Sequence, residues 1–282
     1  MIDRLKSLFH PLWLPTQRAW LDGQDSVRRR LRGQGHLPPR SLRDVGPSDF
    51  VETGQEFLGH FKELGGLQPG HAVLEIGCGS GRMALPLTGY LDPAQGGSYV
   101  GMDVVAPAIA WCQGHITPRF PHFTFRHLDL FNRRYNPTGR VQARDYRFPY
   151  PDGSFDFIFL TSVFTHLLPA DSAHYLHECA RLLTPGGRLF STWLLLNPIQ
   201  AELAAQGRSD IDLAYGMDGY RVRDRAVPES AVGVDEEAVR AFFAGAGLTV
   251  EEPVYYGRWS GRAEGRSYQD LILARRAAGG KA

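Results

Sequence analysis

The chain has 282 residues, of which 43% are hydrophobic and 22% are charged, and its formal net charge at pH 7 is +1. This length can bury a large core, and the balanced charge gives no whole-molecule argument for a nucleic-acid partner. Three scattered cysteines exclude a disulfide framework, no apolar run approaches the roughly 18 residues of a membrane span, and no signal peptide is evident, so we expect a cytoplasmic protein without integral membrane association.

The N-terminal segment is basic, with nine Lys and Arg against four Asp and Glu in residues 1–45. Apolar residues at helical spacing in residues 1–20 predict an amphipathic helix that packs on the body or on a second subunit; contact with a membrane surface is the alternative. Arg28–Arg30 is interpreted as a solvated helix face, because no aromatic side chains alternate with the charges. We assign residues 1–59 to a helical extension.

A second helix is predicted over residues 46–68, where large apolar side chains recur at near-helical spacing until Gly65 and Gly66 end the run. Asp49 and Phe50 lie at its start. The main domain is assigned to residues 60–275.

A glycine-rich turn directly follows a predicted buried strand. Val73, Leu74 and Ile76 form the apolar run, and glycines then occupy every second position, at Gly77, Gly79 and Gly81. Glycine permits positive φ and close approach of a ligand to the main chain, and the helix expected over residues 82–91 would direct its free N–H groups at that ligand. The pattern therefore predicts a nucleotide or adenosine site. Its spacing differs from the G-x-G-x-x-G of dinucleotide-binding proteins, which argues against an NAD-linked oxidoreductase.

Two further predicted strands end in acidic residues. The strand over residues 99–103 ends at Asp103, whose carboxylate can accept both hydroxyls of a ribose. After a helix over residues 106–117, a strand over residues 123–129 ends at Asp129. Asp145 begins a D-x-x-F-P-Y segment farther on and is the rival to Asp129.

The fourth strand is predicted within residues 151–160, and ligands of open α/β sheets gather at its carboxyl end, beginning at Thr161. Asp156, at the start of this strand, is interpreted as structural. His166 is the candidate general base, since a neutral imidazole can take a proton from a hydroxyl or a ring nitrogen. A capping or packing role for His166 is the alternative, because a transfer between two bound reactants can proceed by proximity and orientation alone.

A helix over residues 171–183 is predicted with Asp171 as its N-cap, followed by a Thr-Pro-Gly-Gly turn and a strand over residues 189–195. His174 and His177 on this helix are three residues apart, but a third metal ligand is not evident, so we expect no metal.

Residues 196–232 show no clear strand pattern and are interpreted as an acceptor-side insertion, with a surface decoration as the alternative. A helix over residues 235–245, with Asp235 as its N-cap, precedes two strands over residues 248–256 and 268–274. These strands are expected to form an antiparallel pair. Residues 276–282 are expected to be a disordered tail.

Together these motifs resemble the class I S-adenosylmethionine (SAM) methyltransferases. The resemblance covers residues 60–275. It rests on the E-x-G-x-G-x-G loop after the first strand, on Asp103, on the Pro-Asp-Gly-Ser-Phe-Asp segment at residues 151–156, and on the Thr-Pro-Gly-Gly turn, all in family order. It implies an α/β fold with a seven-stranded, mostly parallel, doubly wound sheet, and an N-terminal extension that caps the cofactor.

The resemblance also implies a set of SAM contacts. Arg82 would pair with the methionine carboxylate, Asp103 would bind the ribose, Val104 would pack on the adenine, Asp129 would accept from the adenine amino group, and the Thr161 carbonyl would face the methionine amino group. The full set of implied cofactor-binding residues is Glu75, Gly77, Cys78, Gly79, Gly81, Arg82, Asp103, Val104, Asp129, Leu130 and Thr161.

The implied reaction is methyl transfer from SAM to a small-molecule acceptor, with O-methylation favoured over N-methylation. The Asn/Asp-Pro-Pro-Tyr/Phe signature of many amino-methylating enzymes is replaced here by Thr161-Ser162-Val163-Phe164. An RNA-directed methyltransferase and a non-catalytic SAM-binding protein are the alternatives, nucleic acid being the less favoured partner. A homo-oligomer formed through the N-terminal helix is a further expectation.

Overall fold

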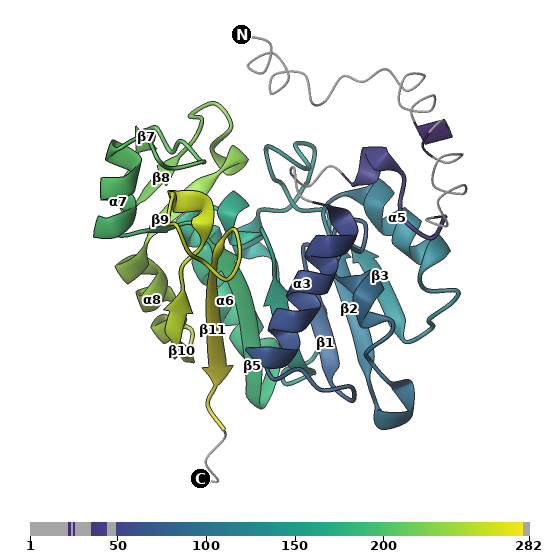
Figure 1. The fold of residues 1–282 in the computed structure, drawn as a ribbon. Helices are drawn as coiled ribbons and strands as arrows, with labels where there is room; N and C mark the ends of the chain where they lie inside the picture. Colours follow the sequence, from purple (N-terminus) through teal and green to yellow (C-terminus); the bar gives the residue numbers. More distant parts are fainter. Residues whose placement is uncertain (1–21, 24, 26–34, 44–48, 279–282) are drawn as a thin grey trace.

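A computed structural model describes residues 22, 23, 25, 35–43 and 49–278 (Figure 1). The amphipathic segment 1–20 and the Arg28–Arg30 cluster lie outside the described residues, as do the last four residues of the tail.

The centre of the molecule is a seven-stranded sheet in the order β10-β11-β5-β4-β1-β2-β3. Its strands are β1 (Ala72–Ile76), β2 (Ser98–Asp103), β3 (Phe123–His127), β4 (Phe155–Leu160), β5 (Leu183–Trp193), β10 (Leu248–Tyr255) and β11 (Asp270–Arg276). Only β11 runs against its two neighbours, β5 and β10, and the other pairs in the sheet are parallel. The predicted seven-stranded, mostly parallel sheet is confirmed, including the antiparallel pair at its end.

Helices cover both faces of this sheet. They are α3 (Phe50–Glu63), α4 (Ala84–Leu87), α5 (Ala106–His115), α6 (Pro169–Leu182) and α8 (Glu236–Gly245). Helix α7 (Pro198–Ala205) packs instead on β6 (Leu195–Leu196) and on the 3-10 turn η6 (Arg258–Ser260). The described chain also forms the short 3-10 turns η1 (Arg40–Leu42), η2 (Pro93–Gln95), η3 (Ala143–Asp145), η4 (Phe164–His166) and η5 (Pro228–Ser230). Helices α3, α4 and α5 share one apolar cluster with the sheet, and α6 and α8 share the other. In Figure 1, α3 crosses in front of the sheet.

Successive side chains of a strand point to opposite faces of the sheet, so one strand contributes to both apolar clusters. Val73 of β1 is fully buried on the α3 side, and Leu74, the next residue, is fully buried on the α6 side. Aromatic rings fill the space between layers: Phe61 of α3 lies 4.3 Å from Phe159, centroid to centroid, and Phe164 stacks on Trp193 at 4.0 Å. A sheet buried on both faces explains why the strands appear in the sequence as continuous apolar runs.

A second, four-stranded sheet lies beside the carboxyl ends of the parallel strands (upper left in Figure 1). Its order is β6-β9-β8-β7, formed by β6 (Leu195–Leu196), β7 (Tyr215–Gly216), β8 (Tyr220–Val222) and β9 (Val232–Asp235). We expected no clear strand in residues 196–232, and that expectation was wrong. Strands of two to four residues are too short to show a periodic pattern, so the sequence carries no signal for them.

Several predicted boundaries also need correction. The helix expected over residues 82–91 is reduced to the single turn α4, in which Pro86 supplies no N–H and Gly89 follows closely. Helix α6 begins at Pro169 with Leu168 at the N-cap, so Asp171 is not the cap. Its carboxylate instead accepts from the Arg144 backbone N–H at 3.1 Å.

Strand β3 ends two residues before Asp129, and β5 begins at Leu183, six residues earlier than expected. The N-cap position of Asp235 on α8 is confirmed, although its side chain makes no capping bond.

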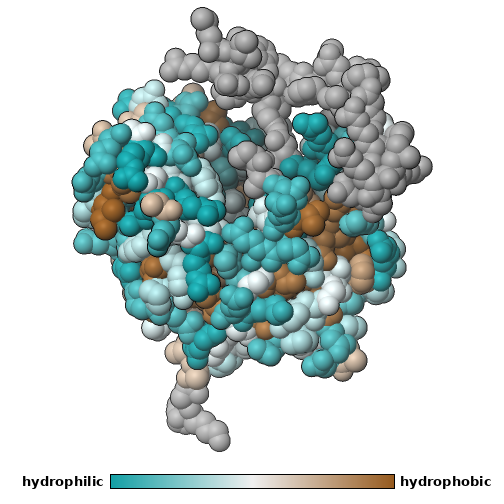
Figure 2. All heavy atoms as spheres, viewed as in Figure 1, coloured by the Kyte–Doolittle hydropathy of each residue, from teal (hydrophilic) through white to brown (hydrophobic). Residues whose placement is uncertain are grey.

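The surface matches the balanced composition. Figure 2 shows a mostly hydrophilic face with apolar residues in separate patches. Within the described part of the chain, no helix combines the length and the apolar character needed to cross a bilayer.

Candidate cofactor and acceptor site

The glycine loop after β1 is fixed to the neighbouring strand. The backbone N–H groups of Gly77 and Cys78 both donate to the Met102 carbonyl, at 2.7 and 3.0 Å. Gly77, Gly79 and Gly81 all have positive φ, between 51° and 84°. A Cβ on Gly77 would lie 2.3 Å from a Val163 methyl group, whereas a Cβ on Gly79 would meet nothing within 4 Å. The loop is therefore packed against the protein at Gly77 and open at Gly79, as a close approach by a ligand requires.

Asp103, at the end of β2, is aimed at this loop. Its two carboxylate oxygens accept from the backbone N–H groups of Gly79 and Val105, each at 2.7 Å, and the residue is 9% exposed. Burial raises the pKa of Asp103, and these two hydrogen bonds act in the opposite direction. A carboxylate has about four acceptor positions, so those left over can receive a diol. The residues present fit the ribose of an adenosine-bearing cofactor.

A buried acidic residue lies beneath the loop, with an arginine at the end of the loop. The Tyr99 hydroxyl donates to Glu75, and burial raises the pKa of Glu75 to about 8, with the Tyr99 bond and Arg82 opposing this. Burial lowers the pKa of Arg82, and the carboxylates of Glu75 and Glu56 partly restore it. Arg82 is therefore a largely buried cation held among acidic groups at the end of the loop. This placement differs from that of a solvated surface arginine.

The two cysteines nearest the loop have a packing role. Cys78 and Cys112 are both buried, and burial raises the pKa of each thiol. A thiol that stays protonated is a poor nucleophile. Cys78 can contact a cofactor through its backbone, in line with its predicted place in the binding set.

Asp129 and Leu130 continue from β3 at the same edge of the sheet. Leu128 donates its N–H to the Asp103 carbonyl at 2.9 Å, which brings the start of this segment to the end of β2. The Asp129 carboxylate pairs with Arg140, which lowers its pKa, and Leu130 is buried. The rival Asp145 is an exposed residue of η3, and η3 packs on α6. The position of Asp129 therefore supports its choice over Asp145.

The carboxyl end of β4 has an unusual backbone. Ser162 has φ of 59°, the only positive φ of a non-glycine residue among those described. Its N–H donates to the Thr192 hydroxyl at 2.7 Å, and its own hydroxyl donates to Gln269 at 3.1 Å. Thr161, directly before it, is buried. Such backbone strain clusters at functional sites, and hydrogen bonds to two other segments hold this one in place.

His166 lies in η4 with both ring nitrogens engaged. Nδ1 is 2.8 Å from the Glu229 carbonyl, which can only accept, so Nδ1 carries the hydrogen. Nε2 is 3.3 Å from the Tyr135 hydroxyl and can only accept from it. Burial lowers the pKa of His166 to about 4, and Arg134 and Arg223 contribute in the same direction. The imidazole is thus neutral, in a defined tautomer, and reaches outward through Tyr135.

Tyr135 and Glu229 are site residues that sequence reasoning missed. Both lie in segments without periodic pattern, and neither segment is adjacent to His166 in the chain. The signal available was the insertion between Asp129 and Asp145, where an aromatic residue stands among Asn and Arg residues. A long loop of this kind near a site is a reason to look for functional residues.

Asp156, which was expected to be structural, joins the ends of three segments. The Asp156 carboxylate accepts from the Ala72 N–H at 2.9 Å and from the Thr184 hydroxyl at 3.2 Å. His174 Nε2 donates to the Tyr146 carbonyl. Across the described ranges, no group of three His, Cys, Asp or Glu is arranged to hold a metal ion.

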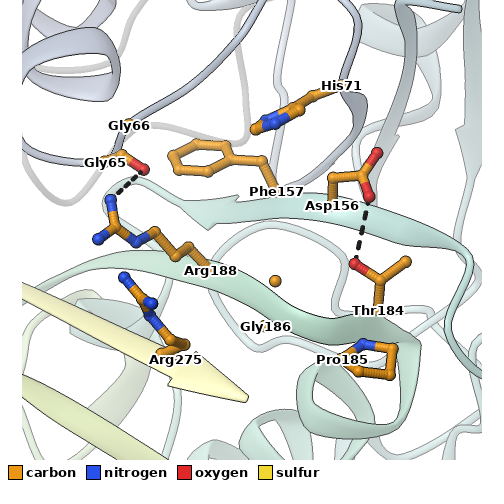
Figure 3. Close-up of a pocket in the computed structure, with 11 residues that line it drawn as sticks. Gly65, Gly66, His71, Asp156, Phe157, Thr184, Pro185, Gly186, Arg188 and Arg275 are labelled. Atoms are coloured by element: carbon orange, nitrogen blue, oxygen red, sulfur yellow. Dashed lines mark hydrogen bonds between the residues drawn. The ribbon is translucent and has the colours of Figure 1, made fainter. Parts of the chain in front are cut away.

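A pocket of about 310 Å³ lies at the opposite edge of the sheet, around the amino end of β4. Figure 3 shows Arg188 pointing toward the Gly65 carbonyl, with Asp156 and Thr184 at the other end. Arg188 and Arg275 both pair with Glu251, whose single negative charge offsets one of the two positive charges. The pocket is separate from the glycine loop and holds none of the predicted site residues.

Comparison with known proteins agrees with this geometry. A family profile described as a methyltransferase domain matches residues 74–191. The chain is 27% identical over 179 residues to a 27-O-demethylrifamycin SV methyltransferase of Amycolatopsis mediterranei, covering 60% of this chain and 59% of the relative. It is 34% identical over 125 residues to a phthiotriol/phenolphthiotriol dimycocerosates methyltransferase of Mycobacterium ulcerans, covering 44% of this chain and 37% of the relative. The matches thus span less than two thirds of either relative.

A solved structure shares the fold. It is the 1,6-didemethyltoxoflavin-N1-methyltransferase of Burkholderia thailandensis, described with bound 1,6-didemethyltoxoflavin and S-adenosylhomocysteine. The TM-score is 0.51 at 17% identity, over 95% of this chain and 92% of that one.

Proposed function

Because the chain carries a methyltransferase domain of the class I, SAM-dependent family, we propose that it transfers a methyl group from SAM to a hydroxyl of a small-molecule acceptor. The observation that carries the proposal is the pairing of Asp103 with the Gly79 N–H at the open position of the glycine loop. This pairing brings together a carboxylate that can accept hydrogen bonds from a diol and an exposed stretch of main chain. Both lie at the carboxyl edge of a parallel sheet, where such folds bind their ligands.

When bound, SAM supplies an electrophilic methyl group on a positively charged sulfur. The chain would hold the cofactor through Asp103 at the ribose, through the glycine loop at the main chain, and through Arg82 at the methionine carboxylate. The remaining proposed contacts are Glu75, Cys78, Val104, Asp129, Leu130 and the Thr161 carbonyl. Orienting donor and acceptor in line provides much of the rate enhancement in such a reaction, since it removes the entropy of bringing them together.

We place the acceptor on the side of the small sheet. Residues 196–232 form most of that sheet, and their η5 turn supplies the Glu229 carbonyl that orients His166. His166 remains our candidate for receiving the acceptor's proton. The relative from Amycolatopsis is named for a 27-O-demethylated substrate, which supports a hydroxyl, while the Burkholderia structure is named for methylation at a nitrogen.

We propose that the segment before α3 covers the cofactor. The Ser80 hydroxyl, inside the glycine loop, donates to the Leu42 carbonyl at 2.7 Å. Helix α3 runs as one element through residue 59, where we placed the domain boundary. The proposed extension therefore ends before Asp49, and among its described residues Leu42 is bonded to the loop.

Two measurements test this function. Calorimetry with SAM and S-adenosylhomocysteine tests cofactor binding, and the expected outcome is a single site for each. Incubation with radiolabelled SAM and a metabolite extract tests transfer, with label expected in small molecules that extract into organic solvent. Label confined to RNA, or binding without any transfer, would contradict the proposal.

A further inference from the structure

The turn that carries Tyr135 is held in shape by one side chain. Asn132 Oδ1 accepts from the N–H groups of Arg134 and Tyr135, at 3.1 and 3.0 Å. The backbone of Asn132 also pairs with that of Asn136 in both directions, at 3.1 and 2.9 Å. Asn132 is 8% exposed, so these bonds are shielded from water. The conformation of the turn is fixed before any ligand arrives.

The same asparagine fastens the turn to η4. Asn132 Nδ2 donates to the His166 carbonyl at 3.1 Å, and the Tyr135 hydroxyl lies 3.3 Å from His166 Nε2. The two rings meet edge to face, with centroids 5.2 Å apart and an interplanar angle of 83°. Main chain and side chain of His166 are thus both tied to one turn, and the Glu229 carbonyl fixes the far side of the ring.

Tyr135 is the exposed end of this otherwise buried arrangement. It is 39% exposed, although large hydrophobic and aromatic residues at the ends of polar networks are commonly covered. The guanidinium of Arg134 lies over its ring at 5.2 Å. Val163, which directly precedes η4, packs against Gly77 of the glycine loop. Tyr135 is therefore the exposed group that reaches His166 at the end of η4, next to the proposed cofactor loop.

We propose that Tyr135 is the catalytic residue that contacts the acceptor hydroxyl, with His166 and Asn132 as positioning residues behind it. This inference rests on the proposed function. Because the phenol donates to Nε2, its oxygen lone pairs face outward and can accept from the acceptor's O–H. As the acceptor oxygen forms its bond to the methyl carbon, the bond from that carbon to the donor sulfur breaks and its electron pair stays on the sulfur. The acceptor O–H bond breaks as well, and that proton passes to the Tyr135 oxygen. The phenolic proton passes to Nε2. The resulting imidazolium carries the positive charge that arrived with the methyl donor, and it then releases a proton to solvent.

The surroundings of His166 suit a proton acceptor that does not retain its proton. The groups facing it are the Tyr135 hydroxyl, the Glu229 carbonyl and the guanidinium groups of Arg134 and Arg223. Two cations and burial oppose a lasting imidazolium. An acceptor oxygen that carries both its proton and the new methyl group is a far stronger acid than imidazolium. Proton transfer from it to this histidine is therefore still favourable.

The test uses the full chain and Tyr135→Phe, which removes one exposed oxygen. Wild type is offered radiolabelled SAM with catechol, 1-naphthol, cyclohexanol and aniline, and the hydroxyl probe that it methylates fastest is used for kinetics. We expect Tyr135→Phe to lower kcat about 100-fold or more, the range for a lost proton-transfer group, and to leave the affinity for S-adenosylhomocysteine within about twofold. Asn132→Ala should lower kcat by a smaller factor.

Tyr90→Phe is the matched control. Tyr90 also has a cation over its ring, Lys62 at 5.2 Å, and its hydroxyl donates to the Leu67 carbonyl, remote from the site. Its kcat should stay within about twofold of wild type.

Wild-type kcat/KM should be flat from pH 8 to pH 5, whereas a base with an ordinary histidine pKa would lose activity below about pH 6.5. Equal kcat for Tyr135→Phe and Tyr90→Phe would overturn the assignment.

Nitrogen NMR of the histidine rings gives a readout independent of turnover. His166 should show a protonated Nδ1 and an unprotonated Nε2, and Tyr135→Phe should shift the Nε2 resonance while Tyr90→Phe leaves it unchanged. A protonated Nε2, or no shift, would overturn the proposal even if wild type is active. If wild type methylates only aniline or none of the probes, the proposed hydroxyl transfer fails first, and the assignment of Tyr135 fails with it.

Discussion

The Asp103 carboxylate accepts two backbone N–H bonds, and this makes a conservative substitution informative. In Asp103→Asn, the amide nitrogen must face the N–H of either Gly79 or Val105, which places two donors together. We expect affinity for S-adenosylhomocysteine to fall at least tenfold, or about 1.4 kcal/mol, by calorimetry.

Asp152→Asn is the control for this change, because Asp152 is an exposed carboxylate paired with Arg181 away from the loop. It should bind S-adenosylhomocysteine as wild type does. Unchanged affinity in Asp103→Asn would remove the ribose assignment.

Glu75 links pH to stability. Its pKa in the folded chain is about 8 against an ordinary 4.5, so the folded state binds more protons between these values. Stability from this group is therefore complete below about pH 4.5 and is lost as pH rises through 8. Glu75→Gln still offers an acceptor to Tyr99 and carries no charge, so the free energy of unfolding in urea should decline less from pH 5 to 8.5 than in wild type. If the free energy of unfolding changes with pH in the same way in the two proteins, Glu75 is not protonated in the folded chain.

The sequence was sufficient to identify the loop glycines and Asp103, because these depend on local backbone conformation and on a fixed place after a strand. Tyr135, Asn132 and Glu229 depend on contacts between segments 31 to 96 residues apart, which local pattern does not encode. Asp49, in contrast, acts locally as the N-cap of α3. Its carboxylate accepts from the N–H groups of Val51 and Glu52.

At the level of elements, the two acidic N-caps provide a matched pair. Asp49 makes two capping bonds on α3, whereas Asp235 at α8 makes none. We expect Asp49→Ala to lower the free energy of unfolding by about 1 kcal/mol, the usual value of a lost cap, and Asp235→Ala by less than half of that. Urea denaturation of both variants measures the difference. Equal losses would indicate that helix-end charge, and not hydrogen bonding, dominates.

Arg181 of α6 joins this helix to the segment before β4. It bonds Glu178 at 2.7 and 2.8 Å, the carbonyls of Phe148 and Tyr150 at 2.9 and 2.8 Å, and Asp152 at 2.8 Å. The side chains of Arg181 and Glu178 are 14% and 10% exposed. Arg181→Ala leaves Glu178 charged and shielded from water, so we expect a loss of about 3 kcal/mol or more in urea denaturation.

Arg147→Ala is the comparison for Arg181. Its side chain is 74% exposed and only 3.5 Å from Asp152, an arrangement worth little in water. We expect a loss below about 0.5 kcal/mol. A small loss in both variants would show that α6 is held by its apolar side alone.

Elements with long apolar runs were predictable, and short ones were not. The seven strands of the main sheet follow from burial on both faces, while the strands of the small sheet are stabilised by tertiary pairing that leaves no periodicity. Helix α6 starts earlier than expected because Pro169 is favourable at a first helical position, and that preference outweighed Asp171 as a cap.

On the scale of the whole molecule, the proposed site is assembled from distant parts of the chain. Leu42 contacts Ser80, Ser267 donates to Glu56 at 2.8 Å, and Gln269 accepts from Thr192 at 2.6 Å. Cofactor binding should therefore slow amide hydrogen exchange in residues 35–43, 77–81 and 258–269 together. Exchange followed by mass spectrometry, with and without S-adenosylhomocysteine, measures this.

Asp103→Asn serves as the control in the exchange experiment, and it should show no protection at the same ligand concentration. The segment around the Arg188 pocket lies at the opposite edge of the sheet and should not respond. Protection limited to residues 77–81 would mean that the N-terminal and C-terminal segments do not take part.

The reversed direction of β11 affects where the sequence of such a protein can vary. Because β10 ends at the carboxyl edge and β11 starts there, residues 256–269 form a connection that stays at this edge. This connection belongs to the last part of the chain and contributes no strand to the parallel core. Its exposed positions can vary and so change which molecules reach the site, whereas the buried Trp259 and the Gln269 that bonds Ser162 are constrained by the fold.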